Sequence, residues 1–279
     1  MKLQFWKYNP SGNTTIFLDN RMGILPRSRY PSLATELMAP QSVSAEQLGC
    51  WEIPVHTDAL GRLHMMGGEF CGNATRCFAK LLCDVGLPGI IWNESHTTCT
   101  VPVEVSGCAD ILYVRIQDYT PEHAIVYGAM PLPILTETIS LNLPNLTTQA
   151  DCVHFDGICH LVLRDVPFSK DTAEQIIHQV YAVPNPPEAL GVIFYYPQQG
   201  NMIPVVYVQG VDSLVYESSC GSGSVATAAS CAFRTGQPVF GLRLQQPGGI
   251  IEVSFSGSSA EIGGMIKNKT EGFVYTEQK

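Results

Sequence analysis

Two cysteines in this chain lie in a sequence setting that suits acid–base chemistry. Cys71 and Cys220 belong to the strings GEFCGNAT (68–75) and ESSCGSGS (217–224), which share a Cys-Gly-polar-small core and lie about half the chain apart. Each string follows strand-like sequence and precedes a run compatible with a helix. The unpaired N–H groups and the partial positive charge at a helix N-terminus favour a thiolate, and they lower its pKa below the ordinary value of about 8.5. We therefore expect two reactive thiols, one in each half of the chain.

Two such thiols on opposite sides of an amino acid would invert its stereocentre. One thiolate removes the α-proton while the other thiol delivers a proton to the opposite face, and the helix-end N–H groups hold the carboxylate. This chemistry is a two-base racemisation or epimerisation that needs no cofactor, with a lysine Schiff base as the open alternative. A single Cys-Gly pair is more often a packing feature, and it is the repetition that favours catalysis.

The elements that must position these thiols follow from the hydrophobic pattern. Helical periodicity predicts helices, and alternating or β-branched runs bounded by Gly, Pro and Asn predict strands. The expected helices are 30–38, 74–82, 169–181 and 224–234. The expected strands are 3–8, 15–18, 101–105, 111–117, 191–196, 205–208, 242–245 and 250–255. The proline-containing stretch 131–133 and the polar stretch 142–149 interrupt the middle of the chain, and a domain boundary is expected near residue 120.

The composition indicates a globular protein and argues against two classes of partner. The 279 residues are 45% hydrophobic and 15% charged, which is the opposite of a disorder signature. A formal net charge of −9 repels phosphate backbones and anionic lipid surfaces. No apolar run approaches the roughly 18 residues of a membrane span, and no signal peptide is recognisable. We expect a cytoplasmic protein that binds neither nucleic acid nor membranes.

The other cysteines give weaker signals. Ten cysteines without a C-x-x-C pair do not indicate a redox or zinc motif, and most are expected to be reduced core residues. Cys152, His154, Cys159 and His160 could bind a metal on paper, but strand packing explains them more simply. The GSGS run has no P-loop lysine, and no G-x-S-x-G elbow occurs, so a phosphate loop and a serine hydrolase are weaker hypotheses. No metal site and no cofactor are predicted.

At these cysteines the sequence resembles the diaminopimelate epimerase superfamily, whose pyridoxal-independent enzymes use two catalytic cysteines. The residues that carry the resemblance are Gly12-Asn13, Gln47, Cys71-Gly72-Asn73, His160 and Cys220-Gly221-Ser222. It implies an α+β fold of two pseudo-symmetric domains, each a mixed β-sheet wrapped around a central helix that carries the catalytic cysteine at its N-terminus. The implied domains are 1–118 plus 266–279 and 119–265, with the active site in the cleft between them.

Differences from the diaminopimelate epimerases indicate another substrate. Those enzymes have a Glu-Arg-Gly-Ala-Gly stretch before the second cysteine that holds the distal amino-acid end, whereas residues 209–214 here read QGVDSL. An Asn-Val pair that binds the same end corresponds to Gly191-Val192. Without these groups the zwitterionic end of diaminopimelate would be poorly paired, and a buried unsatisfied charge is costly.

The sequence is more similar to the histidine racemases that serve opine-type metallophore synthesis, of which the staphylopine pathway is the familiar case. The shared strings are KYNPSGN (7–13), EQ (46–47), EFCGNAT (69–75), SCGSG (219–223) and QPGG (246–249). This resemblance implies conversion of L-histidine to D-histidine, which a partner enzyme would build into a metal chelator.

The resemblance also assigns roles to residues. The two acid–base thiols are Cys71 and Cys220. The cradle for the substrate carboxylate and amine at the helix mouths consists of Gly72, Asn73, Gly221 and Ser222. Further substrate contacts match Asn13 and Gln47.

Three further assignments are weaker. Glu46 is our own addition, because a carboxylate beside Gln47 could pair with an imidazole N–H, although a solvated surface residue is an equal alternative. Tyr8 could border the substrate ring, with core packing as the commoner alternative. His160 is expected to shape the pocket rather than catalyse.

Other functions stay open at this point. The same chemistry would serve a diaminopimelate epimerase with altered recognition or a racemase of another polar amino acid. A protein of the same fold that only binds an amino acid is the non-enzyme alternative, but it has no need for two thiols at mirrored positions. The expected partners are a small-molecule amino acid and a second copy of the chain in a homodimer, as in related enzymes.

Overall fold

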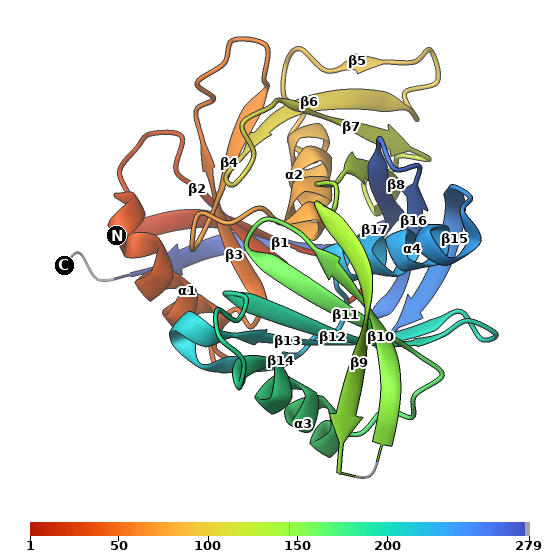
Figure 1. The fold of residues 1–279 in the computed structure, drawn as a ribbon. Helices are drawn as coiled ribbons and strands as arrows, with labels where there is room; N and C mark the ends of the chain where they lie inside the picture. Colours follow the sequence, from red (N-terminus) through yellow and green to blue (C-terminus); the bar gives the residue numbers. More distant parts are fainter. Residues whose placement is uncertain (145, 277–279) are drawn as a thin grey trace. The chain divides into compact units, whose positions relative to one another are not determined.

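The chain folds into two compact units (Figure 1). The computed structural model describes residues 1–144 and 146–276. The first unit combines Met1–Ala129 with Gly263–Lys279, and the second unit spans Met130–Ile262. Among the residues that the structure describes, no helix has the length and apolar character needed to cross a membrane.

The boundaries of these units differ from the expected positions 118/119 and 265/266. The first lies at 129/130, because β8 (His123–Ala129) pairs with β7 (Leu112–Gln117) and stays with the first unit. The second lies at 262/263, within the long strand β17 (Ala260–Tyr275). Residues 277–279 of the expected N-terminal domain lie outside the described residues.

The first unit is a mixed sheet that closes on itself. Its other strands are β1 (Lys2–Asn9), β2 (Thr15–Asp19), β3 (Gln47–Glu52), β4 (Gly61–Met65), β5 (Ile91–Trp92) and β6 (Cys99–Val105). Hydrogen-bonded neighbours run β1, β2, β3, β4, β6, β7, β8, β17 and back to β1. The pairs β2–β3 and β4–β6 are parallel, whereas pairs such as β1–β2 and β6–β7 are antiparallel.

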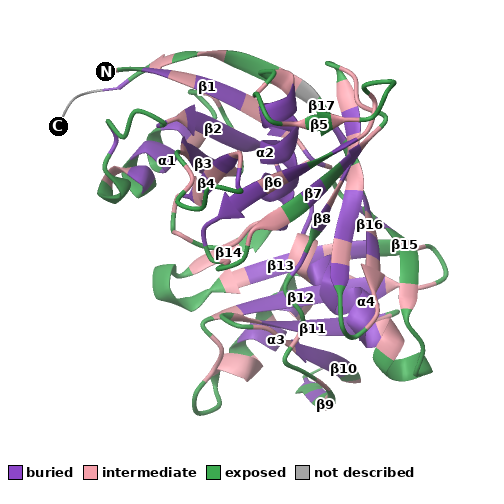
Figure 2. Cartoon of the chain, turned by 90° about the horizontal axis from the view of Figure 1, so that it is seen from above, coloured by how far each residue is buried: buried purple, intermediate pink, exposed green. Residues whose placement is uncertain are grey.

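A fully buried helix lies inside this closed sheet. Every residue of α2 (Gly72–Asp84) from Gly72 to Cys83 is buried, and α2 contacts β1, β2, β4, β6, β7 and β8. Figure 2 shows α2 almost wholly in the colour of buried residues. A short exposed 3-10 helix (Arg27–Arg29) leads into α1 (Tyr30–Met38), which forms a separate small core with Leu48 and Cys50. Because α2 has no face toward water, each polar group on it needs a protein partner.

The second unit is a mixed sheet with helices on both faces. Its strands are β9 (Leu135–Leu143), β10 (Leu146–His154), β11 (Ile158–Arg164), β12 (Ala189–Tyr196), β13 (Asn201–Val208), β14 (Ser213–Tyr216), β15 (Val239–Gln246) and β16 (Gly249–Phe255). Its helices are α3 (Lys170–Tyr181), the 3-10 turn Gln209–Val211 and α4 (Gly221–Thr235). The β11–β12 pair is parallel, and β9–β10, β10–β11 and β12–β13 are antiparallel.

Strand alternation divides the residues of β11 between the two helices. Cys159 and Leu161 pack in one cluster with Ile176 of α3. His160, between them in sequence, points to the other face and contacts Ser222 of α4. Neighbouring residues on β11 therefore lie in different environments, one beside α3 and the other beside α4.

The predicted elements are present. The helix 30–38 matches α1, and the other three expected helices lie within or one residue beyond α2, α3 and α4. The eight expected strands correspond to β1, β2, β6, β7, β12, β13, β15 and β16. The interpretation of 142–149 as an interruption is wrong, because β9 and β10 pair from Leu143↔Leu146 onward as a hairpin. In the half of the hairpin next to the turn, exposed residues alternate with buried or half-buried ones. The inward residues of β9 there are Ile139, Leu141 and Leu143, an apolar alternation that the interpretation overlooked, whereas β10 has the polar Thr148 at an inward position.

A buried ion pair closes the C-terminal end of α2. Lys80 Nζ lies 2.9 Å from Asp84 Oδ1, and the two side chains are 1% and 2% exposed. Asp84 also accepts hydrogen bonds from the hydroxyls of Tyr8 (2.6 Å) and Tyr119 (2.9 Å). Burial, followed by the charge of Asp84, raises the pKa of Tyr8, so this hydroxyl stays protonated and donates.

We predict that Asp84→Asn lowers the free energy of unfolding by about 3–5 kcal/mol, because it leaves the Lys80 cation buried without a counter-charge. Urea unfolding measures the loss. The matched control is Asp19→Asn, which breaks an ion pair whose Arg21 side chain is 42% exposed, and it should change stability by less than about 1 kcal/mol. Equal losses in the two variants would contradict the prediction.

Candidate active site

Cys71 is the N-cap of the buried helix α2. Its backbone is extended, with φ −137° and ψ 111°, and its sulfur accepts a hydrogen bond from the Ala74 N–H at 3.4 Å. A second backbone hydrogen bond comes from Asn73. The thiol thus takes the place that Ser or Asp occupies in ordinary caps, and the sulfur lies at the positive end of the helix.

Gln47 brings a side-chain amide to the same sulfur. The Cys71 thiol donates to Gln47 Oε1 at 3.1 Å, and Thr15 Oγ1 lies 3.3 Å from the same oxygen. Thr15 and Gln47 pair at the first residues of the parallel strands β2 and β3, so both lie at one edge of the sheet. Buried Asn13 ends the turn just before β2 at this edge, and exposed Glu46 directly precedes Gln47. The structure therefore brings Gln47 to Cys71 and places Asn13 and Glu46 beside that edge.

Asn73 is held by a buried arginine that the sequence analysis did not single out. Arg76 Nη2 donates to Asn73 Oδ1 at 2.8 Å, and its Nη1 reaches the carbonyl oxygens of Val126 and Gly264 at 3.4 and 3.5 Å. Arg76 is 0% exposed, and burial lowers its pKa. The sequence signal that could have identified Arg76 is a charged residue within a helix that is otherwise expected to be buried. The guanidinium orients the Asn73 side chain and adds positive charge near Cys71.

Cys220 is the N-cap of α4 in the same way. Its φ and ψ are −121° and 116°, and its sulfur accepts from the Gly223 N–H at 3.3 Å. Gln246 fixes the backbone before the helix, because its Oε1 accepts from the Cys220 N–H at 2.8 Å and its Nε2 donates to Ser224 Oγ at 2.9 Å. A Cβ at Gly223 would lie 2.8 Å from Ile193 Cδ1 and 3.2 Å from the Cys220 sulfur. Glycine at 223 therefore leaves room for the thiol.

A histidine lies behind Cys220 through Ser222. The Ser222 hydroxyl is 3.5 Å from the Cys220 sulfur and 3.0 Å from His160 Nε2. His160 is 0% exposed, and burial lowers its pKa to about 3, so the ring is neutral. An N–H on Nε2 can then donate to Ser222, which leaves the serine proton for the sulfur. Gly191 makes space for this ring, since a Cβ there would lie 1.9 Å from His160 Nδ1.

At both thiols, burial shifts the pKa in the direction opposite to the effect of the helix N-terminus. Desolvation raises the pKa of Cys71 above its usual value despite the hydrogen bond from the Ala74 N–H and the side-chain contact with Gln47. Desolvation, together with the negative charge of Glu217, raises the pKa of Cys220 further. The sequence-based expectation of lowered pKa values is thus wrong for the protein without substrate, because the cost of removing a thiolate from water exceeds the stabilisation by the helix N-terminus.

Acidic residues accompany both thiols. Glu217 forms a side-chain hydrogen bond with Cys220, and the charge of Glu69 acts on Cys71. Both glutamates lie in the strings that identified the cysteines, but no role was predicted for them. The sequence signal that could have identified them is a glutamate shortly before each of the two cysteines. Their negative charge favours a cationic group near each sulfur.

Tyr8 lies away from the thiols. Its ring is 0% exposed, it packs edge-on against Phe17, and its hydroxyl binds Asp84 at the opposite end of α2 from Cys71. The predicted contact between Tyr8 and a substrate ring finds no support in this placement. The core alternative, which is the commoner fate of a strand tyrosine, describes what the structure shows.

We predict that alkylation of Cys71 and Cys220 by iodoacetamide reaches half of its maximal rate at a pH above the ordinary thiol value of about 8.5. The urea-unfolded chain is the internal control, since there the same cysteines should show the ordinary midpoint. Peptide mass spectrometry reports each site. Because the pKa values are raised on folding, these thiols stabilise the fold below the unfolded pKa, and this contribution is lost as the pH rises above it. Midpoints below 8.5 in the folded protein would refute the assignment.

We predict that Gly191→Ala lowers the free energy of unfolding by about 1–3 kcal/mol and changes the alkylation rate of Cys220, because the imidazole must move away from Ser222. In a His160→Ala background the same substitution should lose most of its effect, since the clash is gone. Gly210→Ala is the matched control, because a Cβ there meets nothing within 4 Å. An undiminished effect in the double variant would show that His160 is not the group displaced.

Comparisons with known proteins identify the family of this chain. Residues 2–275 match the family described as the histidine racemase CntK N-terminal domain. A histidine racemase of Fusobacterium nucleatum subsp. nucleatum is 32% identical over 98% of this chain and 97% of its own length. A histidine racemase of Staphylococcus aureus is 28% identical over 99% of this chain and 98% of its own length.

The fold comparison is consistent with this family. The crystal structure of a probable proline racemase from Agrobacterium radiobacter K84 superimposes with a TM-score of 0.63 at 13% identity, covering 99% of this chain and 93% of that one. The likeness shows a shared mixed α+β fold. Together with the family match over nearly the whole chain, it confirms the resemblance found in the sequence: the chain belongs to the histidine racemase family and is an amino-acid isomerase.

Proposed function

We propose that this protein interconverts L-histidine and D-histidine, with Cys71 and Cys220 as the two acid–base groups and without a cofactor. The observation that carries the proposal is the equivalent construction of the two thiols. Each is the N-cap of a largely buried helix, and each sulfur accepts a backbone N–H from the residue three positions on. Histidine is proposed as the substrate because the relatives of this chain are histidine racemases.

The reaction needs one thiolate and one thiol. The thiolate takes the α-proton of histidine, and the thiol on the other face gives its proton to the same carbon. The thiolate has then become a thiol and the thiol a thiolate, so the product enantiomer can react in reverse without a further proton source. Ser222 supports Cys220 as a hydrogen-bond donor, and Gln47 supports Cys71. His160 acts through Ser222 and is a positioning residue in this scheme.

The helix ends bind the carboxylate of the substrate. The N–H groups of Gly72, Gly221 and Ser222 belong to first helical turns, which have no acceptor within their own helix. Charge that moves from the α-carbon into the carboxylate during proton removal is stabilised by such donors. Asn73 belongs to this cradle and Asn13 is a further substrate contact, as the sequence resemblance implies.

The charges around the thiols suit a cationic substrate. Both thiol pKa values are raised in the free protein, so the substrate must favour the thiolate when it binds. The α-ammonium group of an amino acid supplies that positive charge beside the sulfur. Glu217 beside Cys220 then holds the ammonium or an imidazole N–H, and Glu46 is a second carboxylate for the ring.

We assign the two units to a diaminopimelate epimerase-like pair of pseudo-symmetric domains, with the substrate held between them in reach of both thiols. The support is the same local construction at α2 and α4 and the recurring Cys-Gly string. The D-histidine product would supply an enzyme that assembles an opine-type metallophore, as the sequence resemblance implies. A homodimer and a cytoplasmic location stay predictions, and sedimentation equilibrium tests the first.

We predict that Cys71→Ser and Cys220→Ser each lower the rate of histidine racemisation by at least about 100-fold, since general acid–base groups typically contribute 10²–10⁴-fold. Proton NMR of the α-hydrogen in D2O, with chiral analysis of the product, measures the rate. In the wild-type protein, deuterium should enter the product enantiomer before it enters the remaining substrate, because two separate groups exchange the proton.

The matched controls are Cys108→Ser and Cys231→Ser, one half-buried cysteine in each unit that caps no helix. Both should retain wild-type rates. A single catalytic variant with the wild-type rate would refute the two-thiol mechanism. LL-diaminopimelate should be tested in parallel. If the protein turned it over faster than histidine, the result would favour the epimerase alternative. Tight histidine binding without isotope exchange would leave a binding protein of the same fold.

A further inference from the structure

Three neighbouring strands of the second unit place metal-ligating residues on one face of the sheet. His154 and Cys159 are directly opposite each other in the β10–β11 pair, and Cys152 precedes His154 by two residues on the same face. Glu137 of β9 is directly opposite Cys152. Backbone register alone therefore gathers two thiols, an imidazole and a carboxylate.

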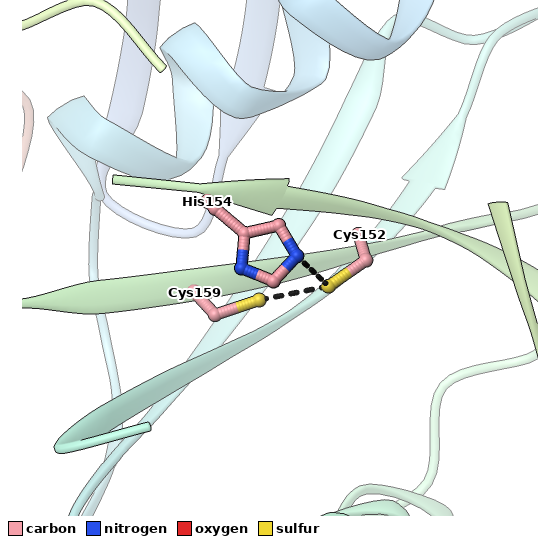
Figure 3. A group of neighbouring side chains, drawn as sticks. All are labelled: Cys152, His154 and Cys159. Carbon is pink, nitrogen blue, oxygen red and sulfur yellow. Dashed lines mark hydrogen bonds between the residues drawn. The ribbon is translucent and has the colours of Figure 1, made fainter. Parts of the chain in front are cut away.

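The side chains meet at short distances. The Cys152 sulfur lies 3.2 Å from His154 Nε2 and 2.9 Å from the Cys159 sulfur, and Figure 3 shows both contacts as dashed lines. The ligand atoms of these three residues all lie within 4.8 Å of one another. Glu137 Oε1 approaches the same His154 Nε2 at 3.1 Å. Three ligand groups thus converge on one point, and Glu137 lies beside them in contact with His154.

This cluster is separate from the thiols of the candidate active site. From the sequence, His160 was a fourth candidate metal ligand, but it lies on the opposite face of β11, where it contacts Ser222. Cys152 and Cys159 belong instead to the core that includes α3. The role of the cluster is therefore independent of the proposed racemase chemistry.

The cluster is buried on one side and accessible on the other. Cys152 and Cys159 are 6% and 5% exposed, whereas the side chain of His154 is 37% exposed. A cavity of about 310 Å³ adjoins it, lined by His154 and Cys159 together with Asp156 and Glu188. Solvent and a dissolved cation can reach the ligands by this route, and the two carboxylates attract positive charge.

We propose that Cys152, His154 and Cys159 bind a zinc-type divalent cation, with Glu137 as the fourth ligand. Two thiolates, one imidazole and one carboxylate form a ligand set that suits borderline-soft Zn²⁺ and not Mg²⁺ or Ca²⁺. Binding forms two metal–sulfur bonds and releases the thiol protons to solvent. This revises the preference for simple strand packing that the sequence favours.

The observed spacing requires only a small adjustment. Zinc–sulfur bonds of about 2.3 Å in a tetrahedral site hold two sulfurs about 3.7 Å apart, so the thiols must separate by somewhat less than 1 Å. Small side-chain rotations on the neighbouring strands β10 and β11 provide this. The bound ion would join β9, β10 and β11 and fix the register of the hairpin.

Titration of the reduced, metal-free protein with Co²⁺ and then Zn²⁺ tests the site. We expect one equivalent of Co²⁺ with the visible bands of tetrahedral coordination and a thiolate charge-transfer band, displaced by Zn²⁺. Cys152→Ser and Cys159→Ser should each weaken Zn²⁺ binding by more than about 100-fold, a larger effect than the 10–100-fold of residues that only support ligands. Zn²⁺ should also raise the melting temperature of the wild type and not of these variants.

Controls separate this site from other thiols. Cys83→Ser alters the other close pair, Cys83 and Cys99, whose sulfurs lie 3.7 Å apart in the first unit, and it should leave binding intact. Cys71→Ser and Cys220→Ser should also bind one equivalent, so the result does not depend on the racemase proposal. Half-exposed His154→Ala is the second test where a buried cysteine variant fails to fold, and it should weaken binding and abolish the Co²⁺ spectrum.

Two results would overturn the proposal. One is the absence of stoichiometric Co²⁺ and Zn²⁺ binding by the fully reduced protein, including the case in which the isolated protein holds a Cys152–Cys159 disulfide and its reduced form binds no metal. The other is binding that persists with unchanged affinity in both Cys152→Ser and Cys159→Ser.

Discussion

The hydrogen-bond requirement of a buried helix N-terminus is the constraint on which the rest of this structure depends. The first turns of α2 and α4 lie within their units, so their N–H groups cannot all be left to water. In both helices a cysteine sulfur accepts one of these bonds. The same contact that completes the helix therefore holds the thiol in place, and stability and reactivity share one set of atoms.

Burial makes these thiols less acidic than the helix N-terminus alone would make them. Desolvation raises both pKa values, against the direction of the helix dipole. Free thiolate is thereby disfavoured until a positive group arrives, and the nearby carboxylates of Glu69 and Glu217 attract such a group. An amino acid carries an ammonium beside the carbon that must lose its proton. A site of this kind couples deprotonation of the thiol to occupancy by the substrate.

The sheet of the second unit uses its two faces for different purposes. Along β11, His160 turns toward α4 and supports Ser222, while its neighbour Cys159 turns toward α3 and the cluster with Cys152 and His154. The period of two in a strand separates these groups across the thickness of one sheet. The polar contact of His160 on one face is therefore separated from the thiol cluster on the other face, even though His160 and Cys159 are adjacent in sequence.

The sequence by itself determined the helices, strands such as β1 and β12 and the two Cys-Gly strings, because hydrophobic period and helix-entry signals are local. It did not reveal the longest strands, β9, β10 and β17. Family resemblance also indicated Gln47 as a substrate contact, and the structure places it against the first thiol. Only the tertiary structure decided what surrounds each group: Tyr8 became a core residue, Gly191 the space for His160, and Arg76 the buried support of Asn73. The sign of the thiol pKa shifts was also decided there, since desolvation depends on neighbours distant in sequence. Strand register likewise separated His160 from Cys159, because facing across a sheet is set by pairing and not by order along the chain.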